Sequence, residues 1–259
     1  MVQNKSIASS FNFHKQAIFF LFFISLVAGF ASAATLNVGP EQTYTTIQSA
    51  IDAAASSGDI INVAAGTYAE HITIGKSLDL LGASKTTTII DGGSSGVVIT
   101  ISASNVVVKG FTIENSGTDI AAHAGIVMAF VTGCTVENNI IQNSASGIAL
   151  LSSSNNFLKD NSISGSARYG IVADYYPGNS THPSLANMFS GNVITTSGRD
   201  GIYLGQDADN NQITGNSISG TTGTTEGSNY EGNGIYFWKS SGNTVTENTI
   251  SIWLREPTA

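Results

Sequence analysis

The chain has 259 residues, a formal net charge of −8 and only 11% charged side chains. This acidic balance argues against nucleic acid as a partner, because a polyanion attracts basic surfaces. Cys134 is the single cysteine, which excludes an internal disulfide, and we expect it to be a small buried hydrophobic residue.

The N-terminal segment predicts a secretory signal peptide over residues 1–33. Two lysines precede a continuous apolar run, residues 17–30, which ends in Ala31-Ser32-Ala33. The run is short for a membrane span, and no second run follows it. We therefore expect a mature chain over residues 34–259 that has no membrane span and is secreted, periplasmic or associated with the cell surface.

The segment Thr45–Ala55 predicts a short helix, because its apolar residues have helical spacing and it lies between a threonine start signal and Gly58. We expect this helix to cap the first coil of the fold described below, since an uncapped coil exposes unpaired strand backbone. Short strands separated by turn signals are predicted to form the first coils. They are Ile60–Val63, Gly66–Tyr68, His71–Ile74, Leu78–Gly82, Thr88–Gly92, Val97–Ile101 and Val106–Ile113.

From residue 125 onward the chain repeats one phrase five times, in which Gly-Ile is followed 14 to 22 residues later by Asn-x-Ile. The glycines are Gly125, Gly147, Gly170, Gly201 and Gly234, and the asparagines are Asn139, Asn161, Asn192, Asn216 and Asn248. A repeat of this period is typical of a solenoid, in which each phrase forms short strands that bury an apolar face only when coils stack. The pattern predicts a parallel β-helix.

Alternation with a period of two predicts which side chains point into this solenoid. The predicted inward pairs are Ile126 with Met128, Ile148 with Leu150, Ile171 with Ala173, Ile202 with Leu204, and Ile235 with Phe237. The asparagines of the repeat are predicted to be turn residues at positive φ that bond a neighbouring backbone group and stack from coil to coil.

Coils stacked about 4.8 Å apart make outward side chains at equivalent positions neighbours. The last three repeats then present a stripe of Arg168, Arg199, Asp174, Asp200, Tyr203, Tyr236 and Trp238. Aromatic faces that pack on sugars, arginines that pair with uronate carboxylates and aspartates that bond hydroxyls are typical of a carbohydrate site. The alternative is a solvated network of ion pairs.

Three insertions are predicted to lie at this end of the solenoid, namely Ser116–Ala124, Tyr175–Leu185 and Thr221–Gly232. Long loops on a rigid scaffold often carry function. The second insertion contains Asn179-Ser180-Thr181, an acceptor pattern for glycosylation.

Three segments and the Asn-x-Ile coils support a family resemblance. The segments are Tyr44–Ala54, Gly66–Glu70 and Ile89–Gly92. With these features the chain resembles the extracellular right-handed β-helix repeat proteins of the pectin-lyase superfamily. It is most similar to the microbial surface and periplasmic types, including relatives of the nitrous-oxide-reductase accessory protein. The resemblance implies a right-handed parallel β-helix over nearly all of the mature chain, but the superfamily includes both enzymes and non-catalytic surface proteins.

Two activities found among similar proteins are not favoured here. Pectin methylesterases share the N-terminal phrases, but this chain has only Gly205-Gln206-Asp207 where they continue with Gln-Asp-Thr-Leu, so we interpret Asp207 as a turn residue. Copper delivery needs clustered His, Met or Cys ligands, whereas His71, His123 and His182 are far apart in the sequence.

We therefore expect a secreted or cell-surface protein that binds polysaccharide, or a cell-envelope glycan, through Arg168, Tyr203, Tyr236 and Trp238. One alternative is a lyase or epimerase acting on uronate-containing glycans, with Asp174, Asp200 and Arg199 as the catalytic candidates. Ca²⁺ is then the candidate cofactor, because it binds oxygen ligands and neutralises carboxylates. Another alternative is a structural envelope protein. Few residues follow Ile250, so we expect that the solenoid is truncated at its C-terminal end.

Overall fold

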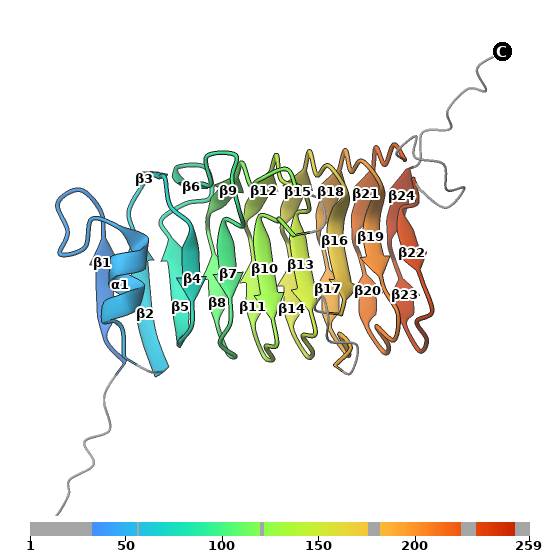
Figure 1. Ribbon diagram of the computed structural model, residues 1–259, viewed down its shortest axis with the longest axis horizontal. Coiled ribbons are helices and arrows are strands. Elements are labelled where there is room, and N and C mark those ends of the chain that lie inside the picture. The colour runs from blue at the N-terminus through green and yellow to red at the C-terminus, as the bar shows by residue number, and fades with distance from the viewer. Residues whose placement is uncertain (1–32, 56, 120–121, 176–181, 224–231, 252–259) are drawn as a thin grey trace, which may run out of the picture. The chain divides into compact units, whose positions relative to one another are not determined.

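The computed structural model describes residues 33–55, 57–119, 122–175, 182–223 and 232–251, all within the compact unit Ala33–Ala259. Residues 1–32 of the predicted signal peptide and the Asn179-Ser180-Thr181 pattern lie outside the described residues. Three parallel sheets form the unit, and successive coils lie side by side in chain order (Figure 1). This arrangement is the predicted parallel β-helix.

The three sheets are here called A, B and C. Sheet A contains β1 (Thr35–Val38), β2 (Ser57–Val63), β5 (Ser77–Gly82), β8 (Val107–Lys109), β11 (Thr135–Glu137), β14 (Phe157–Lys159), β17 (Met188–Ser190), β20 (Gln212–Thr214) and β23 (Thr244–Thr246). Sheet B contains β3 (Gly66–Tyr68), β6 (Thr88–Asp91), β9 (Thr112–Glu114), β12 (Ile140–Gln142), β15 (Ser162–Ser164), β18 (Val193–Thr195), β21 (Ser217–Ser219) and β24 (Thr249–Ser251). Sheet C contains β4 (Ile72–Ile74), β7 (Ile99–Ile101), β10 (Ile126–Ala129), β13 (Ile148–Leu151), β16 (Tyr169–Asp174), β19 (Asp200–Leu204) and β22 (Ile235–Phe237).

The predicted inward columns of sheet C are confirmed over four coils. Ile126, Ile148, Ile171 and Ile202 pair in register, and each is fully buried. The fifth coil differs, because β22 is an edge strand of the sheet and its inward Phe237 is 38% exposed. Cys134 is fully buried, as expected, and burial raises the pKa of its thiol.

The glycine and the isoleucine of each repeated phrase contact each other across the coil. A Cβ built on Gly147 would lie 2.5 Å from Cγ2 of Ile163, and one built on Gly170 would lie 2.4 Å from Cγ2 of Ile194. Neither glycine has a positive φ, so the reason for glycine is steric rather than conformational. The glycine and the isoleucine of the phrase thus mark a packing contact between sheets C and B within one coil.

The asparagines form buried ladders along the solenoid. Asn161 donates its backbone N–H and its side-chain amide to Oδ1 of Asn192, at 3.1 and 3.0 Å, and Asn192 bonds Asn216 in the same way. A second ladder, at the turn between sheets C and A, consists of Asn156, Asn187, Asn211 and Asn243. Each amide therefore satisfies backbone groups that would otherwise be buried without partners.

One part of the asparagine prediction is wrong. The left-handed residue of each turn stands one position earlier than the ladder asparagine, for example Asn138 (φ 52°), Asp160 (φ 56°) and Gly191 (φ 64°). The ladder residue has an ordinary φ because its side chain must point inward to reach the next coil, and the sharp reversal of the chain is made by its neighbour.

The predicted cap is confirmed as α1 (Ile47–Ala53), which lies beside β1 and β2 (Figure 1). Thr46 is its N-cap, and the carboxylate of Glu70 accepts the N–H groups of Ile47 and Gln48 at 2.8 and 2.9 Å. At the other end, Lys76 Nζ donates to the carbonyls of Ile51, Asp52 and Ala54. Side chains of the first coil thus satisfy both ends of the helix.

Candidate functional site

The outer face of sheet C carries a cavity of about 160 Å³ over the middle coils. Residues of β10, β13, β16 and β19 line it, together with the end of the first insertion and the start of the second. The lining residues are Ala122, His123, Ala124, Val127, Ser146, Ala149, Leu151, Arg168, Tyr169, Val172, Asp174, Tyr175 and Tyr203.

The floor of this cavity is apolar. Val127, Ala149 and Val172 pair in register on three successive strands, and each is between 6% and 8% exposed. They form one cluster with Tyr169 and Tyr203, separate from the core of the solenoid. The coils that carry small outward residues therefore contribute the floor of the site.

Three tyrosines form a stack across the last coils. The ring centroids of Tyr169 and Tyr203 are 4.7 Å apart, and those of Tyr203 and Tyr236 are 5.8 Å apart. Because β19 lies between β16 and β22, both faces of the Tyr203 ring are covered by its neighbours. Burial raises the pKa of the Tyr203 hydroxyl, and the charge on Asp174 adds to the shift. The expected stacking of a sugar on the Tyr203 face does not fit this geometry.

Two arginines cover the ring of Tyr169. The guanidinium carbon of Arg168 lies 4.7 Å from the ring centroid, and that of Arg199 lies 5.6 Å from it. A cation over an aromatic face is attracted by the negative face of the ring. Only Arg168 also lines the cavity, where its positive charge partly offsets the rise in the pKa of Asp174 that burial causes.

Asp174 ends β16 at the rim of the cavity. Its Oδ1 accepts the N–H of Tyr175 at 2.8 Å. Burial raises the pKa of the Asp174 carboxyl, while this hydrogen bond and Arg168 act in the opposite direction. A carboxylate that is partly desolvated and has room for a further partner can accept a hydrogen bond from a ligand hydroxyl or take a proton.

Asp200 has a different environment from the one expected of a catalytic candidate. The residue is fully buried, and its Oδ1 accepts the backbone N–H of Asn233 at 3.0 Å and the side-chain amide of Asn233 at 2.9 Å. Arg199 Nε lies 3.8 Å from its other oxygen. This geometry fits a carboxylate that joins adjacent coils and orients Arg199, rather than one that contacts a ligand.

Two of the three predicted insertions contribute walls to the cavity, whereas most of the third, Thr221–Gly232, lies outside the described residues. His123, from the first insertion, lines it, and its Nδ1 accepts the N–H of Asp119 at 3.2 Å. Tyr175, from the second, donates its hydroxyl to a carboxylate oxygen of Asp207. Asp207 has a φ of 57°, so it is the turn residue that was predicted, and it also holds a wall of the site.

Trp238 does not line the cavity. It is 41% exposed, and Lys239 Nζ lies 4.7 Å from the centroid of its ring. Asp174, Gly205 and Trp238 occupy equivalent positions on successive coils, and the carboxylate of Asp174 fills the outward space over Gly205. A ligand that bonds this carboxylate and extends beyond the cavity along the same face would therefore reach the coil that carries Trp238.

The structure thus brings together Arg168, Asp174 and Tyr203 at the cavity, and it places Asp200, Tyr236 and Trp238 outside it. Three of the cavity residues that were not among the predicted site residues have titratable side chains, namely Tyr169, His123 and Tyr175. Tyr169 had a signal in the sequence, because it precedes a repeat glycine at the same position as Asp200. His123 and Tyr175 had none beyond their place in insertions.

Within the described ranges, no group of three or more His, Cys, Asp or Glu side chains is arranged to hold a metal ion. A search of the same ranges finds no helix with the length and apolar character needed to cross a membrane.

Comparisons with known proteins agree with the architecture. The sequence matches the family described as right handed beta helix region over residues 84–250. A cell surface glycoprotein of Methanothermus fervidus is 34% identical over 235 residues, which are 89% of this chain and 37% of that protein. The chain thus spans little more than a third of that relative.

Two solved structures share the fold. The A-module of the mannuronan C-5 epimerase AlgE6 from Azotobacter vinelandii superposes with a TM-score of 0.59 at 20% identity, covering 78% of this chain and 64% of that one. The catalytic domain of a GH87 α-1,3-glucanase gives a TM-score of 0.67 at 16% identity, covering 83% and 38%. The family match, over more than half of the chain, and the three parallel sheets together show that this chain belongs to the right-handed β-helix family.

Proposed function

We propose that this protein is exported to the cell surface and binds an acidic polysaccharide in the cavity on sheet C. The observation that carries the proposal is the combination of an apolar floor with a charged rim. Val127, Ala149 and Val172 form the floor, and Arg168 and Asp174 stand at the rim. Ligand sites are typically concave and apolar with a few placed polar groups.

A sugar ring matches this arrangement because its C–H face is apolar and its edges carry hydroxyls. The ring would lie on the floor, the Asp174 carboxylate would accept a hydroxyl, and the Arg168 guanidinium would pair with a uronate carboxylate. The similarity to a cell surface glycoprotein and to structures that act on polysaccharides supports a surface protein that meets glycans.

A second candidate function is a lyase or epimerase acting on the same class of glycan. Asp174 favours it, because burial raises the pKa of this carboxyl and so makes it a stronger base than an exposed carboxylate. Arg168, alone or with a Ca²⁺ ion brought by the substrate, would neutralise the uronate carboxylate while the proton is removed. In this reading Asp200 and Arg199 position the Tyr169 ring instead of contacting the sugar.

Binding to an array of neutral and uronate-containing glycans, with and without Ca²⁺, tests the proposal. We expect saturable binding of uronate-containing glycans that Arg168→Ala abolishes. Lys159→Ala is the matched control, because it removes an exposed cation from sheet A while Glu137 keeps its ion pair with Lys109. Release of unsaturated uronate or a change of C5 configuration would establish the enzyme. Absence of binding by the folded protein would overturn the proposal and favour a structural envelope component.

A further inference from the structure

A second and larger concavity lies on a different face, over the outer side of sheet A near α1. One basin of about 510 Å³ is lined by residues of β1, β2 and β5 and of the loop between β1 and α1. A neighbouring basin of about 730 Å³ lies over β5, β8 and β11. The two basins share Leu81, Gly82 and Ala83, so they form one groove that runs from coil to coil.

The loop walls of this groove are held in place by hydrogen bonds. On the α1 side, Gly39 donates its N–H to Tyr44 at 2.9 Å, which closes the loop that carries Gln42. On the other side, the loop after β5 is closed by the N–H of Thr88 bonding the Ser84 carbonyl at 2.8 Å. The hydroxyl of Thr112 donates to the carbonyl of Lys85 at 2.6 Å. The groove is therefore pre-formed, which lowers the entropy cost of binding.

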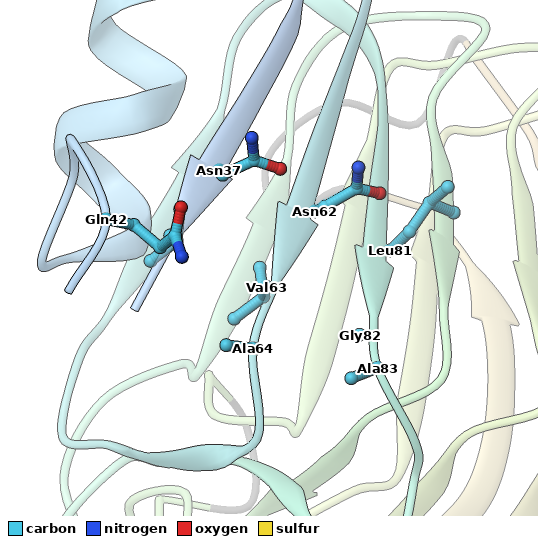
Figure 2. Close-up of a pocket in the computed structure, with 9 residues that line it drawn as sticks. Asn37, Gln42, Asn62, Val63, Ala64, Leu81, Gly82 and Ala83 are labelled. Carbon is cyan, nitrogen blue, oxygen red and sulfur yellow. The ribbon is translucent and has the colours of Figure 1, made fainter. Parts of the chain in front are cut away.

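The first basin presents three side-chain amides. Asn37 and Asn62 pair in register on β1 and β2 and point the same way, and Gln42 reaches toward them from the loop (Figure 2). No hydrogen bond joins any of the three amides to another described residue, and all three side chains are exposed. This contrasts with the fully buried asparagines of the repeats, such as Asn161, Asn187 and Asn192, whose amides donate and accept hydrogen bonds.

The chemistry of the first basin selects a neutral ligand rich in hydroxyl groups. None of its lining residues is charged. Each amide offers one acceptor oxygen and two donor N–H groups, which matches hydroxyls that both donate and accept. Leu81 and Ala83 supply apolar surface beside the amides. Because the amides of Asn37 and Asn62 repeat with the coil spacing, a polymer lying along the groove meets equivalent groups at successive units.

We propose that the first basin of this groove is a second glycan-binding site, specific for a neutral oligosaccharide whose hydroxyls bond Asn37, Asn62 and Gln42. Further sugar units would pass Ala83 into the second basin, whose lining includes Asp79, Lys85, Lys109 and Glu137. The site goes beyond the function proposed for sheet C and does not depend on it. With both sites occupied, one molecule would hold two glycan strands on different faces of the solenoid, which is a crosslinking role.

Titration calorimetry with neutral α-1,4- and β-1,4-linked gluco-oligosaccharides, from disaccharide to hexasaccharide, tests the proposal. We expect affinity to rise with chain length. Asn37→Ala/Asn62→Ala should lower it about thirtyfold, since it removes two hydrogen bonds that are each worth roughly 1 kcal/mol. Gln212→Ala is the matched control, because Gln212 is an exposed amide on the outward side of the same sheet outside both basins.

Two further variants separate this site from the one on sheet C. Ala83→Trp places an indole at an exposed position between the two basins. The indole should block the passage of the sugar chain, so affinity should stop rising at a shorter oligosaccharide length than in the parent protein. Arg168→Ala should leave this binding unchanged. The proposal is overturned if the folded protein binds none of these sugars, if the amide variant binds as the parent does, or if Arg168→Ala removes the binding.

Discussion

The backbone of Gly205 lies directly against the carboxylate of Asp174. A Cβ built on Gly205 would be 2.3 Å from both the carboxyl carbon and Oδ1 of Asp174. The side chain of Asp174 thus occupies the space that a side chain on the next coil would fill. The position of the rim carboxylate depends on a glycine that does not itself line the cavity.

Gly205→Ala should therefore weaken glycan binding without unfolding the protein. The methyl group would push the Asp174 carboxylate away from its position, and contacts that depend on its geometry would be lost. We expect a loss of about tenfold or more in affinity, which corresponds to one charged hydrogen bond. Gly75→Ala is the control, because its nearest contact would be an ordinary 3.7 Å to Ser102 Oγ. Equal binding by both variants would show that Asp174 does not contact the glycan.

Gly147→Ala should destabilise the solenoid rather than the site. The new methyl would lie 2.5 Å from Ile163 Cγ2 and 2.4 Å from the Gly170 carbonyl oxygen, and neither can move freely in a stacked coil. We expect the free energy of unfolding to fall by about 1–3 kcal/mol, as is usual for overpacking. Urea denaturation checks the value, and a stability equal to that of Gly75→Ala would contradict the steric explanation.

Asn192→Leu should cost more than an ordinary buried substitution. The change removes the acceptor for the N–H of Asn161 and the donor to the carbonyl of Leu158, so two buried backbone groups lose their partners. Each unsatisfied group costs roughly 1–3 kcal/mol. Asn138→Gly is the matched control, since this exposed turn residue has a φ of 52° that glycine adopts freely. Thermal and urea unfolding should separate the two variants clearly.

Asp174→Asn should increase stability at neutral pH. Burial raises the pKa of this carboxyl in the folded protein, so the folded state binds the proton more tightly than the unfolded state does. Ionisation of Asp174 therefore lowers stability as the pH rises through the unfolded and then the folded pKa, and this cost is fully present above the folded pKa. The gain from Asn should disappear below about pH 3.9, the pKa of an unperturbed aspartate. A stability difference that does not change with pH would refute this explanation.

Trp238→Ala should affect long ligands only. The Trp238 ring stands outside the cavity, and the coil of Gly205, whose outward space the Asp174 carboxylate fills, separates it from Asp174. Short uronate oligosaccharides should bind the variant as they bind the parent, whereas longer ones should lose the extra affinity that the indole provides. A matched change at Phe157, an exposed aromatic residue on sheet A, should leave both unchanged. A loss of binding for the shortest ligands would place the site nearer β22 than the cavity indicates.

The repeated phrase by itself determined the fold. Gly147 and Ile163 contact each other because every coil needs the same close approach between two sheets, and that need recurs in each coil along the chain. The inward isoleucines, the asparagine ladders and the cap over the first coil follow from the same local rules, since each coil contacts only its neighbours. The alignment of coils on their glycines also identified the outward face on which the cavity lies.

The tertiary structure decided how the residues of that face are used. Asp174 and Asp200 have the same chemistry and lie in the same stripe, yet one stands at the rim of the cavity and the other is buried against Asn233. The tyrosine rings cover one another, and His123 and Tyr175 enter the site from insertions whose paths no repeat predicts. Burial and ring contacts depend on which side chains meet across coils. A periodic sequence specifies the spacing of those side chains, whereas only their packing determines which atoms remain available to a ligand.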